Sequence, residues 1–166
     1  MEVYTSKKEF IAKGHFQIGS IAVRVLSFKQ EEINHDFWKH KLEVAYDMRR
    51  SIGIATNPTN NTYRLVHGEG DNLPGLVIDV YARTAVMQAH SAGMHVDRMA
   101  IAEALSEVMG DQIENIYYKS ETTLHLKRTF SRRTVSLKEE AATTSLRNMA
   151  EIPCRLAEGT KKQDFL

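Results

Sequence analysis

The 166-residue chain has a single cysteine, no long apolar run and no excess of either charge. One cysteine, Cys154, cannot form an internal disulfide, and it excludes the multi-cysteine zinc sites of small metal-binding domains. No apolar stretch approaches the roughly 18 residues of a membrane-spanning helix, and the first residues lack the apolar core of a signal peptide. The formal net charge of +1 gives no overall field that would attract nucleic acid or a membrane. We therefore expect a cytoplasmic protein with no membrane contact, in which any basic surface is local.

The first 30 residues carry the alternation of short β-strands. Strands are predicted at Glu2 to Tyr4 and at Phe10 to Ala12, and Ile21, Val23 and Val25 line one face of a third at period two. Three strands are too few for a closed barrel. We therefore expect the chain to begin partway through a small β-domain.

A helix is predicted next, with Asn34 or Asp36 as its N-cap and Gly53 at its end. Six apolar residues recur at helical spacing: Phe37, Trp38, Leu42, Ala45, Met48 and Ile52. The opposite face is predicted to carry four basic residues: Lys39, Lys41, Arg49 and Arg50. Two interpretations remain open for this basic face, namely an ordinary solvated surface and a surface that contacts phosphate.

The rest of the ordered pattern predicts three strands, a helix and a further strand. The strands fall near residues 63–67, 76–81 and 84–90, the helix near 95–109 and the last strand near 113–119. Together with the preceding helix this is an α+β fold. We expect seven apolar residues to be buried together: Trp38, Leu42, Leu65, Val77, Val86, Leu105 and Ile116.

The segment RLVHGEGDNLPGLVIDVY, from Arg64 to Tyr81, places acidic residues and glycines between two predicted strands. It can be a hairpin whose turn uses Pro74 and Gly75, with Arg64 paired to Glu69 or Asp71. It can also be a functional loop on a rigid sheet. A metal site on Glu69, Asp71 and Asp79 would support a small metal-dependent hydrolase, but the spacing is not that of an EF-hand loop. We expect no metal site.

Three stretches together resemble one family: GHFQIGSIAVRVLSF, FWKHKLEVAYDMR and TYRLVHGEGDNLPGLVIDVY. They are similar to class I S-adenosylmethionine-dependent methyltransferases that modify cytosine C5 in large-subunit ribosomal RNA, and the resemblance runs from Glu2 to about Leu126. Members have an N-terminal PUA RNA-binding domain, a central α+β domain and a Rossmann-like domain that binds the cofactor and carries a nucleophilic cysteine. The resemblance implies that residues 1–30 are the C-terminal part of a PUA-like domain and residues 34–126 the central domain.

The resemblance also implies a role for the predicted site residues. Arg64, Glu69 and Asp71 would lie at the wall of the substrate cleft, while basic side chains and splayed bases would hold ribosomal RNA. We expect no catalytic and no cofactor-binding residue in this chain, because a glycine-rich strand-to-helix loop is absent from the sequence. Nothing near Cys154 supplies an activating base, so we interpret that thiol as incidental. A homodimer is compatible with the sequence.

Residues 127–166 no longer follow the family and show no clear period, so we expect an irregular tail. The family continues there into a segment of the form Gln-Lys-Thr-Gly-Phe-Phe. Codons compatible with the last residues, read from the third base of the Thr160 codon, permit that segment. Our hypothesis is that the tail is the family sequence read in a shifted frame, which the nucleotide sequence would decide.

Two functions from different classes follow from these observations. The first is a fragment that represents the RNA-binding, substrate-side region of such a methyltransferase and is inactive alone. The second is a stand-alone RNA-binding or adaptor module derived from one. An open reading frame for the cofactor domain just downstream would favour the first.

Overall fold

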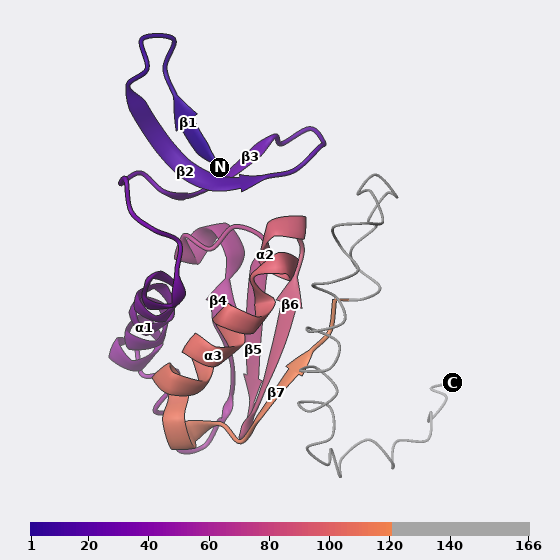
Figure 1. The fold of residues 1–166 in the computed structure, drawn as a ribbon. Helices are drawn as coiled ribbons and strands as arrows, with labels where there is room; N and C mark the ends of the chain where they lie inside the picture. The colour runs from indigo at the N-terminus through magenta and orange to yellow at the C-terminus, as the bar shows by residue number, and fades with distance from the viewer. Residues whose placement is uncertain (121–166) are drawn as a thin grey trace, which may run out of the picture. The chain divides into compact units, whose positions relative to one another are not determined.

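The computed structural model describes residues 1–120, which adopt an α+β fold with two separate sheets (Figure 1). The predictions for the tail at 127–166 and for Cys154 lie outside the described residues. No helix within residues 1–120 is long and apolar enough to cross a membrane.

The first sheet is an antiparallel meander made of the predicted N-terminal strands. Its members, in spatial order, are β1 (Glu2–Tyr4), β2 (Phe10–Phe16) and β3 (Val23–Ser27). The β1–β2 turn contains Lys8 with a positive φ of 65°. Strand β2 continues four residues beyond the predicted Ala12. Ala12 of β2 and Leu26 of β3 are the buried apolar side chains of this sheet.

Helix α1 (His35–Ser51) has the predicted ends. The Asn34 side chain accepts a hydrogen bond from the backbone N of Phe37 at 3.0 Å, and Gly53 follows the last turn with a φ of 77°. The buried residues are Phe37, Trp38, Leu42 and Ala45, which is most of the predicted apolar face. Met48 and the C-cap residue Ile52 are 52% and 62% exposed, since Ala45 is the last fully buried residue of the helix.

The second sheet has the order β4-β5-β6-β7, with the last pair parallel. Its strands are β4 (Thr62–His67), β5 (Leu76–Tyr81), β6 (Thr84–Ala89) and β7 (Asn115–Tyr118), and the short 3₁₀ helices η1 (Gly68–Asp71) and η2 (Gly110–Gln112) precede β5 and β7. The single helix predicted near 95–109 is two helices, α2 (Ala92–Val96) and α3 (Arg98–Met109). The Ser91 side chain caps α2 by accepting from the Met94 backbone N, and Gly110 ends α3 as predicted.

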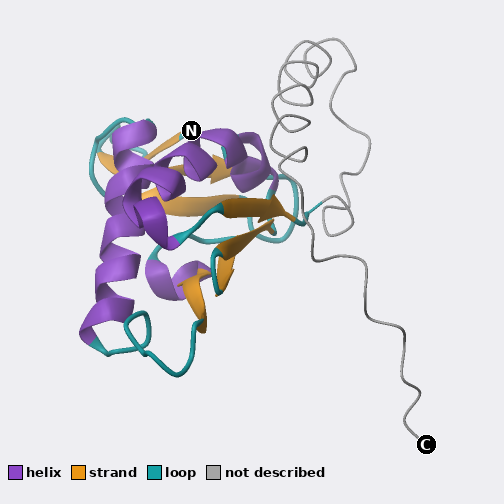
Figure 2. Cartoon of the chain, turned by 90° about the horizontal axis from the view of Figure 1, so that it is seen from below, coloured by secondary structure: helices purple, strands orange, loops and turns teal. Residues whose placement is uncertain are grey.

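Helices α1 and α3 pack side by side on the same side of this sheet (Figures 1 and 2). Alternate residues of β5 and β6 are therefore fully buried: Leu76, Ile78, Val80, Ala85, Met87 and Ala89. The predictions for Trp38, Leu42, Leu65 and Leu105 are confirmed.

The predictions for Val77, Val86 and Ile116 were wrong, since these three side chains are only half-buried. Val77 and Val86 lie on the opposite face of the sheet, one residue out of phase with the core. The segment Leu76 to Val80 has apolar residues at both parities, so its alternation alone does not choose the buried face.

Candidate functional site

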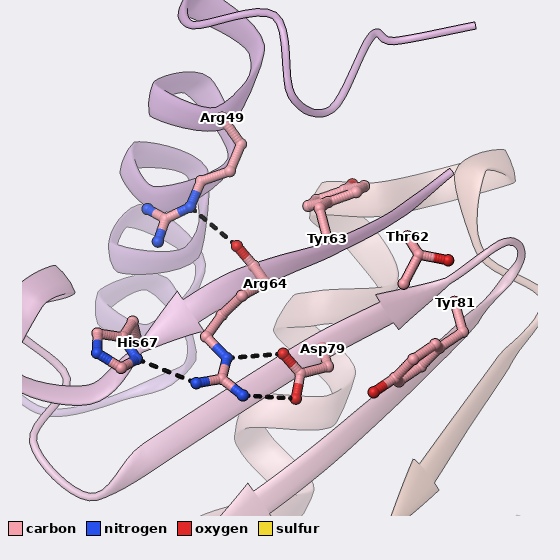
Figure 3. Close-up of a pocket in the computed structure, with 7 residues that line it drawn as sticks. All are labelled: Arg49, Thr62, Tyr63, Arg64, His67, Asp79 and Tyr81. Atoms are coloured by element: carbon pink, nitrogen blue, oxygen red, sulfur yellow. Dashed lines mark hydrogen bonds and ion pairs between the residues drawn. The ribbon is translucent and has the colours of Figure 1, made fainter. Parts of the chain in front are cut away.

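A pocket of about 540 Å³ lies beside strands β4 and β5 (Figure 3). It is polar and aromatic, and its lining residues are Arg49, Thr62, Tyr63, Arg64, His67, Asp79 and Tyr81. Two of the predicted site residues, Arg49 and Arg64, are therefore brought together here. Strand β4 contributes most of the lining, and β5 contributes Asp79 and Tyr81.

Arg64 forms a bidentate ion pair with Asp79, which lies opposite it on the neighbouring strand (Figure 3). The Nε and Nη2 atoms of Arg64 donate to the two carboxylate oxygens at 2.7 and 3.0 Å. Nη1 of Arg64 is 3.3 Å from Nδ1 of His67. The hydrogen bonds that Arg64 donates to the Asp79 carboxylate raise the pKa of its guanidinium. The prediction that Arg64 pairs with Glu69 or Asp71 was wrong, because strand pairing places Asp79 directly across from it.

Asp71 pairs instead with Arg49 of α1. Nη1 and Nη2 of Arg49 donate to the Asp71 carboxylate at 2.5 and 2.8 Å, and Nε donates to the backbone O of Arg64 at 3.1 Å. The Arg49 side chain is only 12% exposed and that of Asp71 5%. Asp71 also accepts from the backbone N of His67. Arg49 therefore links α1, β4 and the β4–β5 loop, and it does not lie on an exposed basic face as predicted.

The loop between β4 and β5 has positive φ angles at positions that asparagine and glycine occupy. Asn72 adopts the left-handed conformation after η1, and Leu73 is fully buried beneath the loop. The backbone N of Leu76 donates to the Leu73 carbonyl, with Pro74 and Gly75 between them and a Gly75 φ of 86°. This is the geometry of a type II turn and confirms the predicted turn chemistry. The loop thus holds Asp71 in a fixed position toward Arg49.

The other predicted basic residues of α1 do not form one surface. Successive residues of a helix are turned by about 100°, so Lys41 lies on nearly the opposite side of α1 from Lys39 and Arg50. The Lys39 ammonium is 3.0 Å from Glu107. Its hydrogen bond to the Glu107 carboxylate raises the pKa of Lys39. Lys41 lies over the Phe37 ring, and Arg50 pairs with Asp47 at 3.5 Å. These separate contacts, two of them with acidic side chains, support the interpretation of an ordinary solvated surface.

The carboxylates of the Arg64–Tyr81 segment do not converge. Asp71 and Asp79 each have an arginine partner, and Glu69 is exposed on η1. Within residues 1–120 there is no group of three His, Cys, Asp or Glu side chains that could hold a metal ion.

Two tyrosines in the pocket were missed by the sequence interpretation. Tyr63 is partly buried, and this burial, with a smaller contribution from Tyr46, raises the pKa of its phenol to about 12. Tyr81 ends β5 and is 50% exposed beside the Arg64–Asp79 pair. The signal was present in the sequence, because Tyr81 has the same strand parity as Asp79 and so shares its face.

Comparison with known proteins places the chain beside ribosomal RNA methyltransferases, although no family model matches it. It is 33% identical over 171 residues to ribosomal RNA large subunit methyltransferase I of Aliivibrio fischeri, covering 100% of the chain and 42% of that protein. The protein of the same name from Photobacterium profundum is 34% identical over 142 residues, covering 84% of the chain and 35% of the relative. The chain thus spans less than half the length of these relatives.

Solved structures show the same fold at lower identity. A Streptococcus mutans protein described as a SAM-dependent methyltransferase matches with a TM-score of 0.65 and 20% identity, over 73% of this chain and 32% of its own. A methyltransferase complexed with SAH matches with a TM-score of 0.65 and 19% identity, over 79% of this chain and 34% of its own. The chain therefore shares its α+β fold with part of each of these proteins.

Proposed function

We propose that this chain is the RNA-binding, substrate-side region of a SAM-dependent methyltransferase that modifies cytosine C5 of large-subunit ribosomal RNA. The observation that carries the proposal is the similarity to ribosomal RNA large subunit methyltransferase I across the whole chain. The methylation chemistry would belong to a cofactor domain of the kind that the resemblance implies. The N-terminal sheet would be the PUA-like part, and the β4–β7 sheet with its helices the central domain.

Of the seven candidate residues, Arg64 is best placed to contact RNA. Its side chain is 47% exposed in the pocket, whereas Arg49 and Asp71 are buried against each other. The negative charge of Asp79 is balanced by Arg64 itself, so the pocket presents no unpaired carboxylate to a phosphate backbone. Lys39 and Arg50 of α1 are paired with Glu107 and Asp47 and would contribute little.

Binding of RNA by the purified 166-residue chain tests this proposal. We expect weak binding to a ribosomal RNA fragment, measured by fluorescence anisotropy, with an affinity that falls as salt rises. Arg64→Gln should weaken binding. Arg50→Gln should leave the salt dependence unchanged, because Asp47 already offsets that charge. A chain that binds no RNA at low salt would overturn the proposal.

We further propose that residues 1–120 do not bind S-adenosylmethionine. The β6–α2 connection, the sequence AHSAGM, lacks the glycine pattern that lets a backbone approach a dinucleotide-type cofactor. Calorimetry with the chain and S-adenosylmethionine should show no heat of binding at micromolar concentrations. A stoichiometric complex would contradict this assignment.

A further inference from the structure

The face of the β4–β7 sheet opposite the core residues is polar, aromatic and partly exposed. The pairing register aligns one residue from each strand in a row across this face: Arg64, Asp79, Val86 and Tyr117. The next row, formed by the neighbouring outward positions, includes Tyr81. Residues at the alternate positions of β5 and β6 are fully buried on the helix-covered side. The outward side chains therefore form a surface that the described helices leave open.

Two exposed tyrosine rings lie on this surface, Tyr81 of β5 and Tyr117 of β7. Tyr81 is 50% and Tyr117 57% exposed. They lie two strands and two residues apart, so their Cα atoms are roughly 12 Å from each other by standard sheet spacings. Bases of a single strand can be splayed apart and stacked on separate aromatic side chains, so two bases of one strand can occupy the two rings.

The Arg64 side chain is 47% exposed on this surface, and most of its donors are already used. Nε and Nη2 bind Asp79, and Nη1 binds His67 (Figure 3). A guanidinium fixed in this way is poorly able to clamp a phosphate with two parallel hydrogen bonds. Its plane remains available to stack on a base, which is a common mode of recognising unpaired RNA.

The electrostatics of the surface allow a polyanion to approach. Asp79 is balanced by Arg64, and Glu114, just before the start of β7, is 3.0 Å from Arg83. Lys119 is exposed just beyond β7. The exposed Glu69 lies outside the strands, in η1.

We infer that this surface is a stacking site for unpaired nucleotides of RNA, with Tyr81 and Tyr117 each taking one base and Arg64 supporting a third planar contact. The inference rests on the proposed RNA-binding function and adds the form of RNA that is recognised. Bases of a duplex are stacked on each other and cannot reach a flat sheet, so the site selects single-stranded segments.

The inference is tested with the full chain, an unstructured single-stranded RNA oligonucleotide and the duplex of the same sequence. Tyr81→Ala and Tyr117→Ala should each weaken single-strand binding about fivefold to a hundredfold, the range that loss of one stacked base produces. Tyr81→Phe and Tyr117→Phe keep the ring and should bind like the wild type. Val96→Ala removes a 66% exposed apolar side chain of α2, outside the strands of this sheet, and is the control.

Each outcome decides a different point. Alanine variants that bind the single strand like the wild type would overturn the stacking site while leaving the proposed RNA-binding function intact. Phenylalanine variants as weak as the alanine ones would overturn stacking in favour of a hydroxyl contact. A change of oligomeric mass in the alanine variants would identify a contact between copies of the chain instead. If the wild type binds neither RNA, the proposed function itself fails. Unfolding curves of the exposed-site variants verify that each is folded.

Discussion

Arg49 and Asp71, 22 positions apart, form a bidentate ion pair in which both side chains are nearly buried. The pair fastens helix α1 to the loop between β4 and β5, and the same arginine also binds the Arg64 carbonyl. The loop therefore depends on a helix that precedes it by more than ten residues. This connection fixes one side of the pocket.

Removing the Arg49–Asp71 ion pair should lower the stability of the folded chain. Arg49→Ala leaves the Asp71 carboxylate nearly buried without its cation, and we expect the free energy of unfolding to fall by about 3 kcal/mol or more. Arg49→Lys should recover only part of this, since an ammonium cannot bind both oxygens in the same geometry. Urea denaturation measures the change. Arg50→Ala, on the exposed pair with Asp47, is the control and should shift stability by no more than about 0.5 kcal/mol. Equal losses for Arg49→Ala and Arg50→Ala would contradict the assignment.

The Arg64–Asp79 pair should respond asymmetrically. The Asp79 side chain is 13% exposed and that of Arg64 47%, so the arginine can return to water more easily than the carboxylate. Arg64→Ala should therefore cost about 1–3 kcal/mol of stability, because it leaves a nearly buried carboxylate with fewer partners. Adding Asp79→Asn to Arg64→Ala should restore part of the loss, as a double-mutant cycle by chemical denaturation would show. Additive losses would indicate that the two side chains are not coupled.

Gly93 of α2 should be intolerant of a side chain, because a Cβ there would overlap the His15 ring of β2. His15 also binds Asp97 at 2.8 Å through its Nε2 atom. Gly93→Ala should lower stability by about 1–3 kcal/mol through overpacking. His15→Ala in the same chain removes the ring part of the overlap and leaves the Cβ of residue 15, which is 2.5 Å from the added Cβ, so the double variant should lose less than the sum of the two single losses without recovering the wild-type stability. Gly19→Ala, where a Cβ meets nothing within 4 Å, is the control. Thermal unfolding of the four variants provides the measurement.

Local signals in the sequence predicted the elements well. The bounds of β5 are those expected from its apolar run, and Asn34, Gly53 and Gly110 mark helix ends because their chemistry satisfies or permits the terminal backbone. Gly75 likewise has the positive φ that its turn requires. These features depend on neighbouring residues alone, so a single sequence is enough to find them.

Contacts between elements were harder to predict. Arg64 is close in sequence to Glu69 and Asp71, yet the β4–β5 register places Asp79 opposite it. The buried face of β5 was misassigned for a related reason: apolar residues occur at both parities, and the choice depends on which side the helices cover. Helix packing and strand register are set by the whole chain, which is why the two arginine–aspartate pairs appeared only in the structure.

The partly buried phenol of Tyr63 gives the last prediction, a loss of stability at high pH. Its pKa of about 12 in the folded chain lies above the ordinary value of 10.0, so the folded state holds this proton more tightly than the unfolded state. The contribution to stability is therefore fully present below about pH 10 and is lost as the pH rises through about 12. Tyr63→Phe has no such proton, and its stability should fall less than that of the wild type over this window. Denaturation at a series of pH values measures the difference, with Tyr117→Phe, which removes a 57% exposed phenol, as the control. Parallel pH profiles for the wild type and Tyr63→Phe would show that burial does not hold this proton.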